Sequence, residues 1–169
     1  ITEAMSGSAS WAADIAIKKP AMNFNIQSSL KGLAINLPAP LGKTSAQEAY
    51  FTAIRKQTVE KEDRFDISYG DIASAIIFRH KKNGDLAFSR GDIGINMPAK
   101  IATTPGLSLR GEFDYLNADE WLEFTKNSKG KSNTSAGTNL SNVELSIQQL
   151  DILNRSLNTL EISATPSDG

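Results

Sequence analysis

The strongest constraint on the fold is an apolar residue at every second position, a pattern that recurs in many short segments. Trp11, Ala13, Ile15 and Ile17 form the first such set. Side chains two apart on a strand lie on the same face, so the alternation predicts amphipathic strands with one wet face, as is common in antiparallel sheets. Further sets are Met22/Phe24/Ile26, Phe65/Ile67/Tyr69, Ile93/Ile95/Met97, Leu107/Leu109, Phe113/Tyr115, Val143/Leu145/Ile147 and Leu160/Ile162/Ala164.

Turn and cap signals separate the apolar segments. Asn83-Gly84 lies between two apolar runs and predicts a β-hairpin. Asn117, with Glu120 three residues later, predicts the N-cap of a helix that ends near Lys126. Residues 45–59 fit both a helix, because Ser45 begins a capping-box pattern, and a strand, because apolar residues alternate from position 49. The sequence therefore predicts a mainly β fold, largely antiparallel, with one or two short helices.

The composition excludes several classes of protein. A chain of 169 residues suits a single domain, here one β-rich segment over 1–169, and a net charge of −1 gives no drive toward nucleic acid. Without cysteine there is neither a disulfide framework nor a thiolate metal site. Residues 126–140 are rich in Ser, Gly, Asn, Thr and Lys, and we expect a mobile loop there. The chain starts at Ile1 without a methionine, and we interpret it as a piece of a longer protein.

No residue pattern in the sequence points to catalysis. His80 is the only histidine, and its neighbours Arg79 and Lys81 are cations that oppose metal binding. The carboxylates show no paired spacing, and neither a nucleophile elbow nor a phosphate-binding loop can be read. We expect a non-enzymatic protein with no catalytic residue, metal or cofactor.

Two motifs far apart in the sequence give a more specific signal. Residues 33–43 read LAINLPAPLGK, where Pro38 and Pro40 fix their own φ and favour extended backbone before them, and Gly42 permits a turn. Residues 105–111 read PGLSLRG, and a predicted strand then runs toward Trp121.

Together these motifs resemble the AsmA-like family of large bacterial envelope proteins, specifically the YhdP type, in which GLxIxLPxPLGK is followed by PGLxLxGxxxxLxxxxW. The order and spacing of the motifs carry the resemblance, which runs from about Gly7 to Ala164. The matching positions are Gly32, Leu33, Ile35, Leu37, Pro38, Pro40, Leu41, Gly42, Lys43, Pro105, Gly106, Leu107, Leu109, Gly111, Leu116 and Trp121.

The resemblance implies a periplasmic segment, anchored in the inner membrane by a part outside this chain. It implies transport of phospholipid between the inner and outer membranes and support of the outer-membrane permeability barrier. The implied partners are phospholipid acyl chains, neighbouring β segments of the same protein and, through other parts, the two membranes. It also favours a curved sheet, and a strand that begins near Glu48.

An apolar sheet face could form a groove for acyl chains, because burial of each methylene contributes about 0.8 kcal/mol. A different class of function stays open: a β-sandwich module that binds carbohydrate or protein would bury the same side chains between two sheets. The residues that we expect to contact the ligand in a groove are Trp11, Ile15, Phe24, Ile26, Phe65 and Ile67.

Overall fold

The computed structural model describes residues 4–18, 21–57, 62–82, 85–128 and 140–165. Among these residues, β1 (Met5–Gly7) and β4 (Leu33–Ile35) form a small two-stranded sheet, and the single helix is α1 (Ala118–Ser128). The remaining strands are β2 (Trp11–Lys18), β3 (Ala21–Ser28), β5 (Phe51–Gln57), β6 (Asp63–Tyr69), β7 (Ala73–Lys82), β8 (Asp85–Ile95), β9 (Gly106–Asn117), β10 (Leu140–Ile152) and β11 (Arg155–Ala164).

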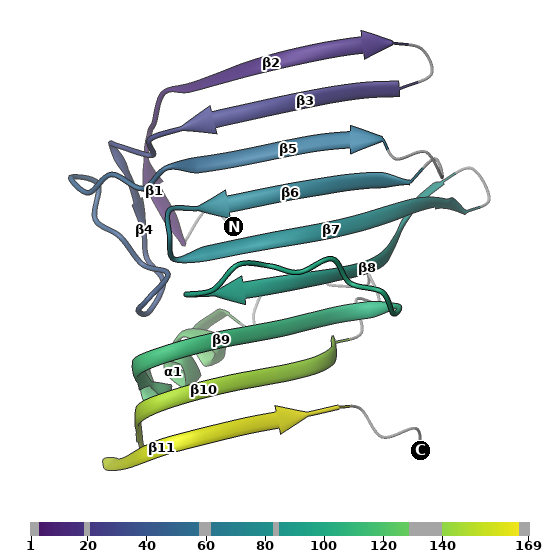
Figure 1. Ribbon diagram of the computed structural model, residues 1–169. Helices are drawn as coiled ribbons and strands as arrows, with labels where there is room; N and C mark the ends of the chain where they lie inside the picture. Colours follow the sequence, from purple (N-terminus) through teal and green to yellow (C-terminus); the bar gives the residue numbers. More distant parts are fainter. Residues whose placement is uncertain (1–3, 19–20, 58–61, 83–84, 129–139, 166–169) are drawn as a thin grey trace.

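These nine strands form one large open sheet, in the order β11-β10-β9-β8-β7-β6-β5-β3-β2 (Figure 1). The sheet is not closed and is consistent with the expected curved sheet, so the mainly β prediction is confirmed. The two packed sheets of a β-sandwich are not the architecture of this chain. The predicted hairpin around positions 83 and 84 is confirmed by antiparallel pairing of β7 with β8, although those two residues lie outside the described part.

The sheet is mixed, whereas the alternation pattern predicts a largely antiparallel one. Pairs β8–β9 and β9–β10 are parallel, and the other neighbouring pairs are antiparallel. Residues 96–105 run back across one face of the sheet between β8 and β9 (Figure 1), and α1 lies in the connection between β9 and β10. Periodicity shows which face a side chain occupies but not the direction of the neighbouring strand, so the sequence did not reveal these connections.

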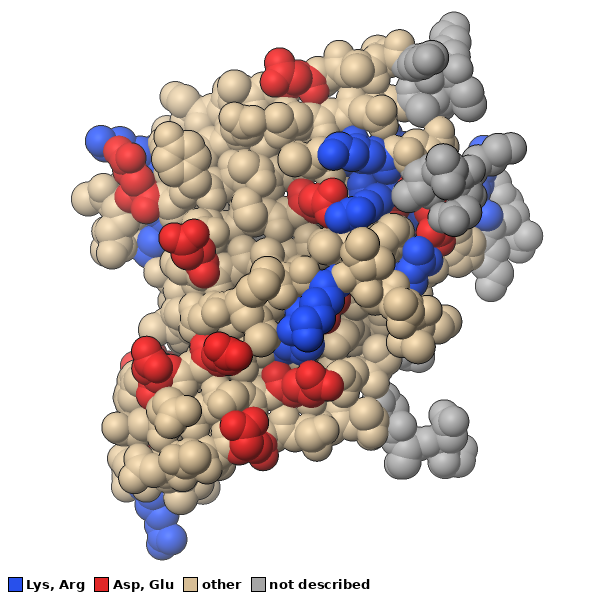
Figure 2. Space-filling model, in the orientation of Figure 1, with Lys and Arg blue, Asp and Glu red and all other residues tan. Residues whose placement is uncertain are grey.

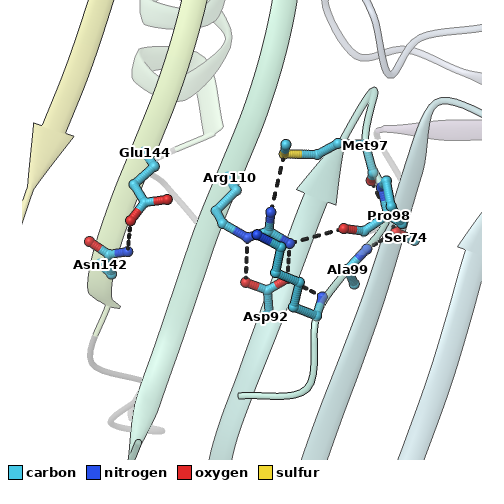
Figure 3. Close-up of polar contacts among 9 residues, drawn as sticks. Ser74, Asp92, Met97, Pro98, Ala99, Arg110, Asn142 and Glu144 are labelled. Atoms are coloured by element: carbon cyan, nitrogen blue, oxygen red, sulfur yellow. Dashed lines mark hydrogen bonds and ion pairs between the residues drawn. The ribbon is translucent and has the colours of Figure 1, made fainter. Parts of the chain in front are cut away.

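An ion pair fastens the 96–105 connection to the sheet (Figure 3). Arg110 on β9 donates from Nε and Nη2 to the Asp92 carboxylate on β8, at 2.9 and 2.8 Å, and both residues are buried. The same two side chains bind the connection: Arg110 donates to the carbonyl of Pro98, and the Lys100 N–H donates to Asp92. Gly94 lies under this segment, where a Cβ would come within 2.4 Å of the Met97 carbonyl oxygen. The connection therefore packs directly on the backbone of β8.

The proline motif and α1 pack against each other at one end of the sheet. The Trp121 indole N–H on α1 donates to the carbonyl of Ala39 at 3.0 Å, and the Tyr69 hydroxyl on β6 donates to the carbonyl of Leu41 at 3.1 Å. The two motifs singled out in the sequence are thus in direct contact, 82 residues apart in the chain.

Close contacts explain the Gly-Lys that ends the proline motif. A Cβ on Gly42 would lie 2.0 Å from the Leu37 carbonyl oxygen, so close approach, rather than a left-handed backbone, requires glycine here. Lys43 is buried, and its ammonium donates to the carbonyls of Leu30, Leu33 and Thr44. The lysine thereby links the backbone before β4, the start of β4 and the residue after the proline motif.

The cap of α1 forms at the predicted residue. The Asn117 side-chain oxygen accepts hydrogen bonds from the N–H groups of Asp119 and Glu120, at 3.0 and 3.3 Å. The carboxylate of Glu120 accepts from the side-chain amide of Asn117 rather than from its backbone N–H, so the capping box is incomplete.

Three sequence-based boundaries differ from the structure. The strand expected from near Glu48 begins at Phe51, and Ser45 does not cap a helix. Of the loop expected over 126–140, positions 129–139 lie outside the described residues; α1 continues to Ser128, and β10 begins at Leu140.

The strict alternation also breaks near the ends of β9, β10 and β11. Asp114 and Tyr115 are both exposed, so Leu116 packs with Phe113 instead of Tyr115. The matching level of β10 and β11 also has adjacent exposed pairs: Gln148 with Gln149, and Asn158 with Thr159. Thr159 adopts φ 56°, a conformation that a β-branched residue rarely takes.

The core cluster at this level is Phe113, Ile147 and Leu150, with Ala118 of α1 packed against it.

Substitution of Trp121 tests the contact between the helix and the proline motif. Trp121→Phe keeps an aromatic ring but removes the indole donor, so the free energy of unfolding should fall by about 1 kcal/mol. Trp121→Ala should cost about 3 kcal/mol, and Leu122→Ala, at a side chain 44% exposed, less than about 0.5 kcal/mol. Denaturant titration measures all three, and indistinguishable losses would show that α1 is not docked.

The Asp92–Arg110 pair should make stability depend on acid. Burial alone would raise the pKa of the Asp92 carboxyl, but the bonds from Arg110 and Lys100 outweigh burial and hold this pKa below its ordinary value. The unfolded chain therefore binds a proton first as pH falls. The stabilisation that the ionised Asp92 gives the folded chain is complete above about pH 4, and it is lost as pH falls through the pKa of Asp92 in the folded state.

Asp92→Asn should cost about 3 kcal/mol at neutral pH and remove this part of the acid dependence. The matched control is Asp66→Asn, which breaks a half-exposed pair with Arg64 and should cost less than about 1 kcal/mol. Urea titrations between pH 2.5 and 7 measure both effects. If the free energy of unfolding depended on pH in the same way in Asp92→Asn and in the unsubstituted chain, Asp92 would not be the source of this acid dependence.

Candidate functional site

One face of the large sheet carries apolar side chains across all nine strands. Strand register sets them side by side: Ile15 faces Phe24, Ile26 faces Ala53, and Ala53 faces Ile67. We call this surface the apolar face. Its members are Trp11, Ala13, Ile15, Ile17, Met22, Phe24, Ile26, Phe51, Ala53, Phe65, Ile67, Ala75, Ile77, Ile93, Leu109, Val143, Leu145 and Ile162.

The opposite face is polar and carries the 96–105 connection. Figure 2 shows acidic and basic side chains of both signs scattered over it. Phe78 is buried there, with the guanidinium groups of Arg64 and Arg90 at 5.9 and 4.0 Å from its ring centroid. The charges of this face are arranged in local pairs, such as Arg64 with Asp66 and Arg90 with Glu62.

The apolar face is largely open to solvent. Trp11, Ile15 and Ile17 on the edge strand β2 are 70%, 62% and 72% exposed. On the inner strands Met22 is also exposed, and the other members of the apolar face are half-buried. Monomeric soluble proteins rarely expose large contiguous apolar surfaces unless something binds them. The exposure therefore makes this face the candidate binding surface.

The structure places all six predicted ligand-contacting residues on the apolar face. Phe24 and Phe65 lean toward each other across β5, with ring centroids 6.3 Å apart. The six come from β2, β3 and β6, and β5 completes the surface between them with Ala53. Contact of these residues with a ligand stays a prediction. The six are Trp11, Ile15, Phe24, Ile26, Phe65 and Ile67.

The two ends of the apolar face differ. At the end where β6 finishes, the proline motif and α1 approach it through Tyr69 and Trp121. At the other end, Arg55 and Asp63 share the face with Phe65, because they lie two positions from Ala53 and Phe65 respectively. Arg79 on β7 is paired with Asp63.

These three charged residues form a compact cluster, the Arg55–Asp63–Arg79 cluster. Arg55 Nη2 lies 2.9 Å from Asp63 Oδ1, and Arg79 Nη2 lies 3.5 Å from Asp63 Oδ2. The Asp63 side chain is only 4% exposed, and the Arg79 guanidinium lies over the Phe65 ring at 4.5 Å.

Sequence reasoning missed this cluster because charged residues near the end of a strand are ordinarily solvated. The alternation could have revealed the cluster, because each of the three residues lies an even number of positions from an apolar-face residue on its own strand and therefore shares that face. His80, the histidine considered in the sequence, pairs with Ala87 within the sheet.

Comparison with known proteins identifies the family. A family model described as YhdP protein matches residues 1–169. The chain belongs to the YhdP family. Neither a curated protein nor a solved structure matches significantly. YhdP family membership is consistent with a lipid-transport protein of the cell envelope, and within the described residues no helix has the length and hydrophobicity to cross a membrane.

Aspartate substitutions distinguish an open apolar face from a sealed core. In Phe24→Asp the new carboxylate stays near water, so the free energy of unfolding should fall by no more than about 2 kcal/mol. In Ile147→Asp the carboxylate replaces a side chain 1% exposed and should cost more than about 4 kcal/mol. Thermal and urea unfolding test the difference, with Ile67→Asp as a second open-face variant. Unfolding of both open-face variants would identify the apolar face as a closed interior.

Proposed function

We propose that this segment carries phospholipid acyl chains along its apolar face, as a non-enzymatic part of a periplasmic protein that moves phospholipid between the inner and outer membranes. The observation that carries the proposal is the continuous, solvent-open apolar surface across nine strands. Acyl chains offer many methylenes to bury, each contributing about 0.8 kcal/mol, and such binding needs no catalytic group. Through this transport the protein would support the outer-membrane permeability barrier.

The opposite, polar face of the sheet is poorly suited to an acyl chain. Buried charges there are paired, as in Asp92 with Arg110, and the 96–105 connection covers part of that face. An apolar ligand would therefore find its continuous surface only on the apolar face.

The edges of the sheet support a role within a longer structure. Within the part of the chain that the structure describes, β2 and β11 each pair with one strand, so each presents a row of backbone donors and acceptors along its other side. We propose that neighbouring β segments of the same protein pair with these edges and extend the apolar face. The membrane anchor would lie in a part of the protein outside this chain.

Fluorescence quenching tests whether acyl chains contact the apolar face. The sequence contains two tryptophans, so Trp121→Phe leaves Trp11 as the only reporter. Monomeric lysophosphatidylcholine with a dibrominated stearoyl chain should quench Trp11 strongly, while the unbrominated lipid should not. Bromine quenches at short range, so the signal requires the chain to lie beside Trp11.

The matched control moves the reporter to the other face. Asn23 lies on the polar face of β3, so Asn23→Trp in a background with Trp11→Phe and Trp121→Phe should be quenched far less. Phe24→Asp should also reduce quenching of Trp11. Equal quenching of the reporters on both faces would reject the apolar face as the acyl site.

A further inference from the structure

The Arg55–Asp63–Arg79 cluster differs from the other ion pairs of the sheet in its charge balance. On the polar face, Arg64 pairs with Asp66, and the Arg90 guanidinium makes two bonds to Glu62. In the cluster, two guanidinium groups share one carboxylate. The cluster therefore keeps one unit of positive charge at one end of the apolar face, where Gln57 and Lys81 lie on the same side of the sheet.

The cluster also leaves hydrogen-bond donors unused. A guanidinium has five N–H donors. Arg55 donates to the Met22 carbonyl and to Asp63, at 2.6 and 2.9 Å. Arg79 makes one hydrogen bond within the described residues, the long one of 3.5 Å to Asp63. The buried Nε atoms of both arginines have no acceptor in that part of the chain.

Arg79 is the accessible member of the cluster. Its side chain is 36% exposed, against 16% for Arg55 and 4% for Asp63. Its guanidinium carbon lies 4.5 Å from the centroid of the Phe65 ring. Positive charge and apolar surface are therefore in direct contact at this point.

The apolar surface that starts at Arg79 is long enough for an acyl chain. Along β7, Ile77, Ala75 and Ala73 occupy the same face in succession. Six residues of strand span about 20 Å, whereas the hydrocarbon layer of one membrane leaflet is about 15 Å thick. An amphiphile with its anionic group at Arg79 could thus keep its whole chain on the apolar face.

We propose that Arg79, supported by Arg55, binds the phosphate of a phospholipid whose acyl chains lie on the apolar face. This inference rests on the proposed function and adds where the head group sits and what holds it. Guanidinium groups suit phosphate because they form charge-assisted, often bidentate, hydrogen bonds. Asp63 holds the two guanidinium groups together and limits their mutual repulsion.

Two probes that differ only in the phosphate test the proposal. They are 1-palmitoyl lysophosphatidic acid and 1-monopalmitoylglycerol, bound as monomers and followed through Trp11 fluorescence in the Trp121→Phe background. The chain should bind the phosphate-bearing probe about tenfold more tightly. Arg79→Gln should abolish this preference while leaving the affinity for monopalmitoylglycerol unchanged.

The matched control is Arg64→Gln. Arg64 lies on the polar face, and its side chain is 31% exposed. The Arg64→Gln substitution therefore removes the same charge as Arg79→Gln, but from a neighbouring strand and the opposite face. It should keep the tenfold preference, and the melting temperatures of the two variants show whether both remain folded. Arg79→Lys, which keeps the charge but loses the fork of donors, should retain part of the preference.

The outcomes separate this inference from the proposed function. Equal affinity for the two probes in the unsubstituted chain, or equal loss of preference in Arg79→Gln and Arg64→Gln, would overturn the phosphate site and leave acyl binding intact. Failure of both probes to bind would overturn the proposed function itself. Inorganic phosphate should not displace lysophosphatidic acid at millimolar concentration; displacement would identify a site for free phosphate instead of a lipid head group.

Discussion

The buried ion pair between Arg110 and Asp92 holds the position at which the sheet changes from antiparallel to parallel pairing. A parallel neighbour requires the chain to return along the sheet before the next strand starts. Here the return is an irregular segment lying on the sheet, whose backbone polar groups must find partners. The same two side chains join β8 to β9 and bind that segment through Pro98 and Lys100. Removal of either charge would leave the other buried and unpaired, and would release the connection as well.

Few side chains in the described residues form a dry interior. The buried apolar residues are Phe78, Phe113, Ile147 and Leu150, and three of these lie in one cluster near α1. Most of the apolar face is half-buried at best, because among the described residues α1 and the proline motif cover only one end of it. Much of its stability therefore comes from the backbone ladder and from neighbouring side chains on the same face. A ligand or a neighbouring segment that covered the apolar face would add to the stability of the folded chain by binding it.

Much of the fold could be predicted from local patterns. Alternation located most strands and their apolar sides, and Asn117 marked the start of α1 correctly. The six predicted groove residues do share one face, because parity along a strand needs no knowledge of distant neighbours. What could not be predicted depends on contacts between distant segments: the parallel pairs, the contact of Trp121 with Ala39, and the burial of Asp63 between two arginines. Ser45 shows the reverse case, since a local helix signal yields to a turn in which Thr44 binds Gln47.

The shared break in alternation across β9, β10 and β11 restricts how this part of the sequence can evolve. Two adjacent exposed residues occur at the same level of all three strands. Beyond that level β9 and β10 turn Leu116 and Leu150 to the core, and the exposed Leu157 of β11 lies beside Leu150. Deletion of one residue from a single strand at this level would move every later side chain of that strand to the opposite face of the sheet, while the side chains of the two neighbouring strands kept their faces. Leu116, Leu150 and Leu157 would then no longer meet. Insertions and deletions here would be tolerated only if they arose together in all three strands, so the lengths of these strands should be inherited as a unit.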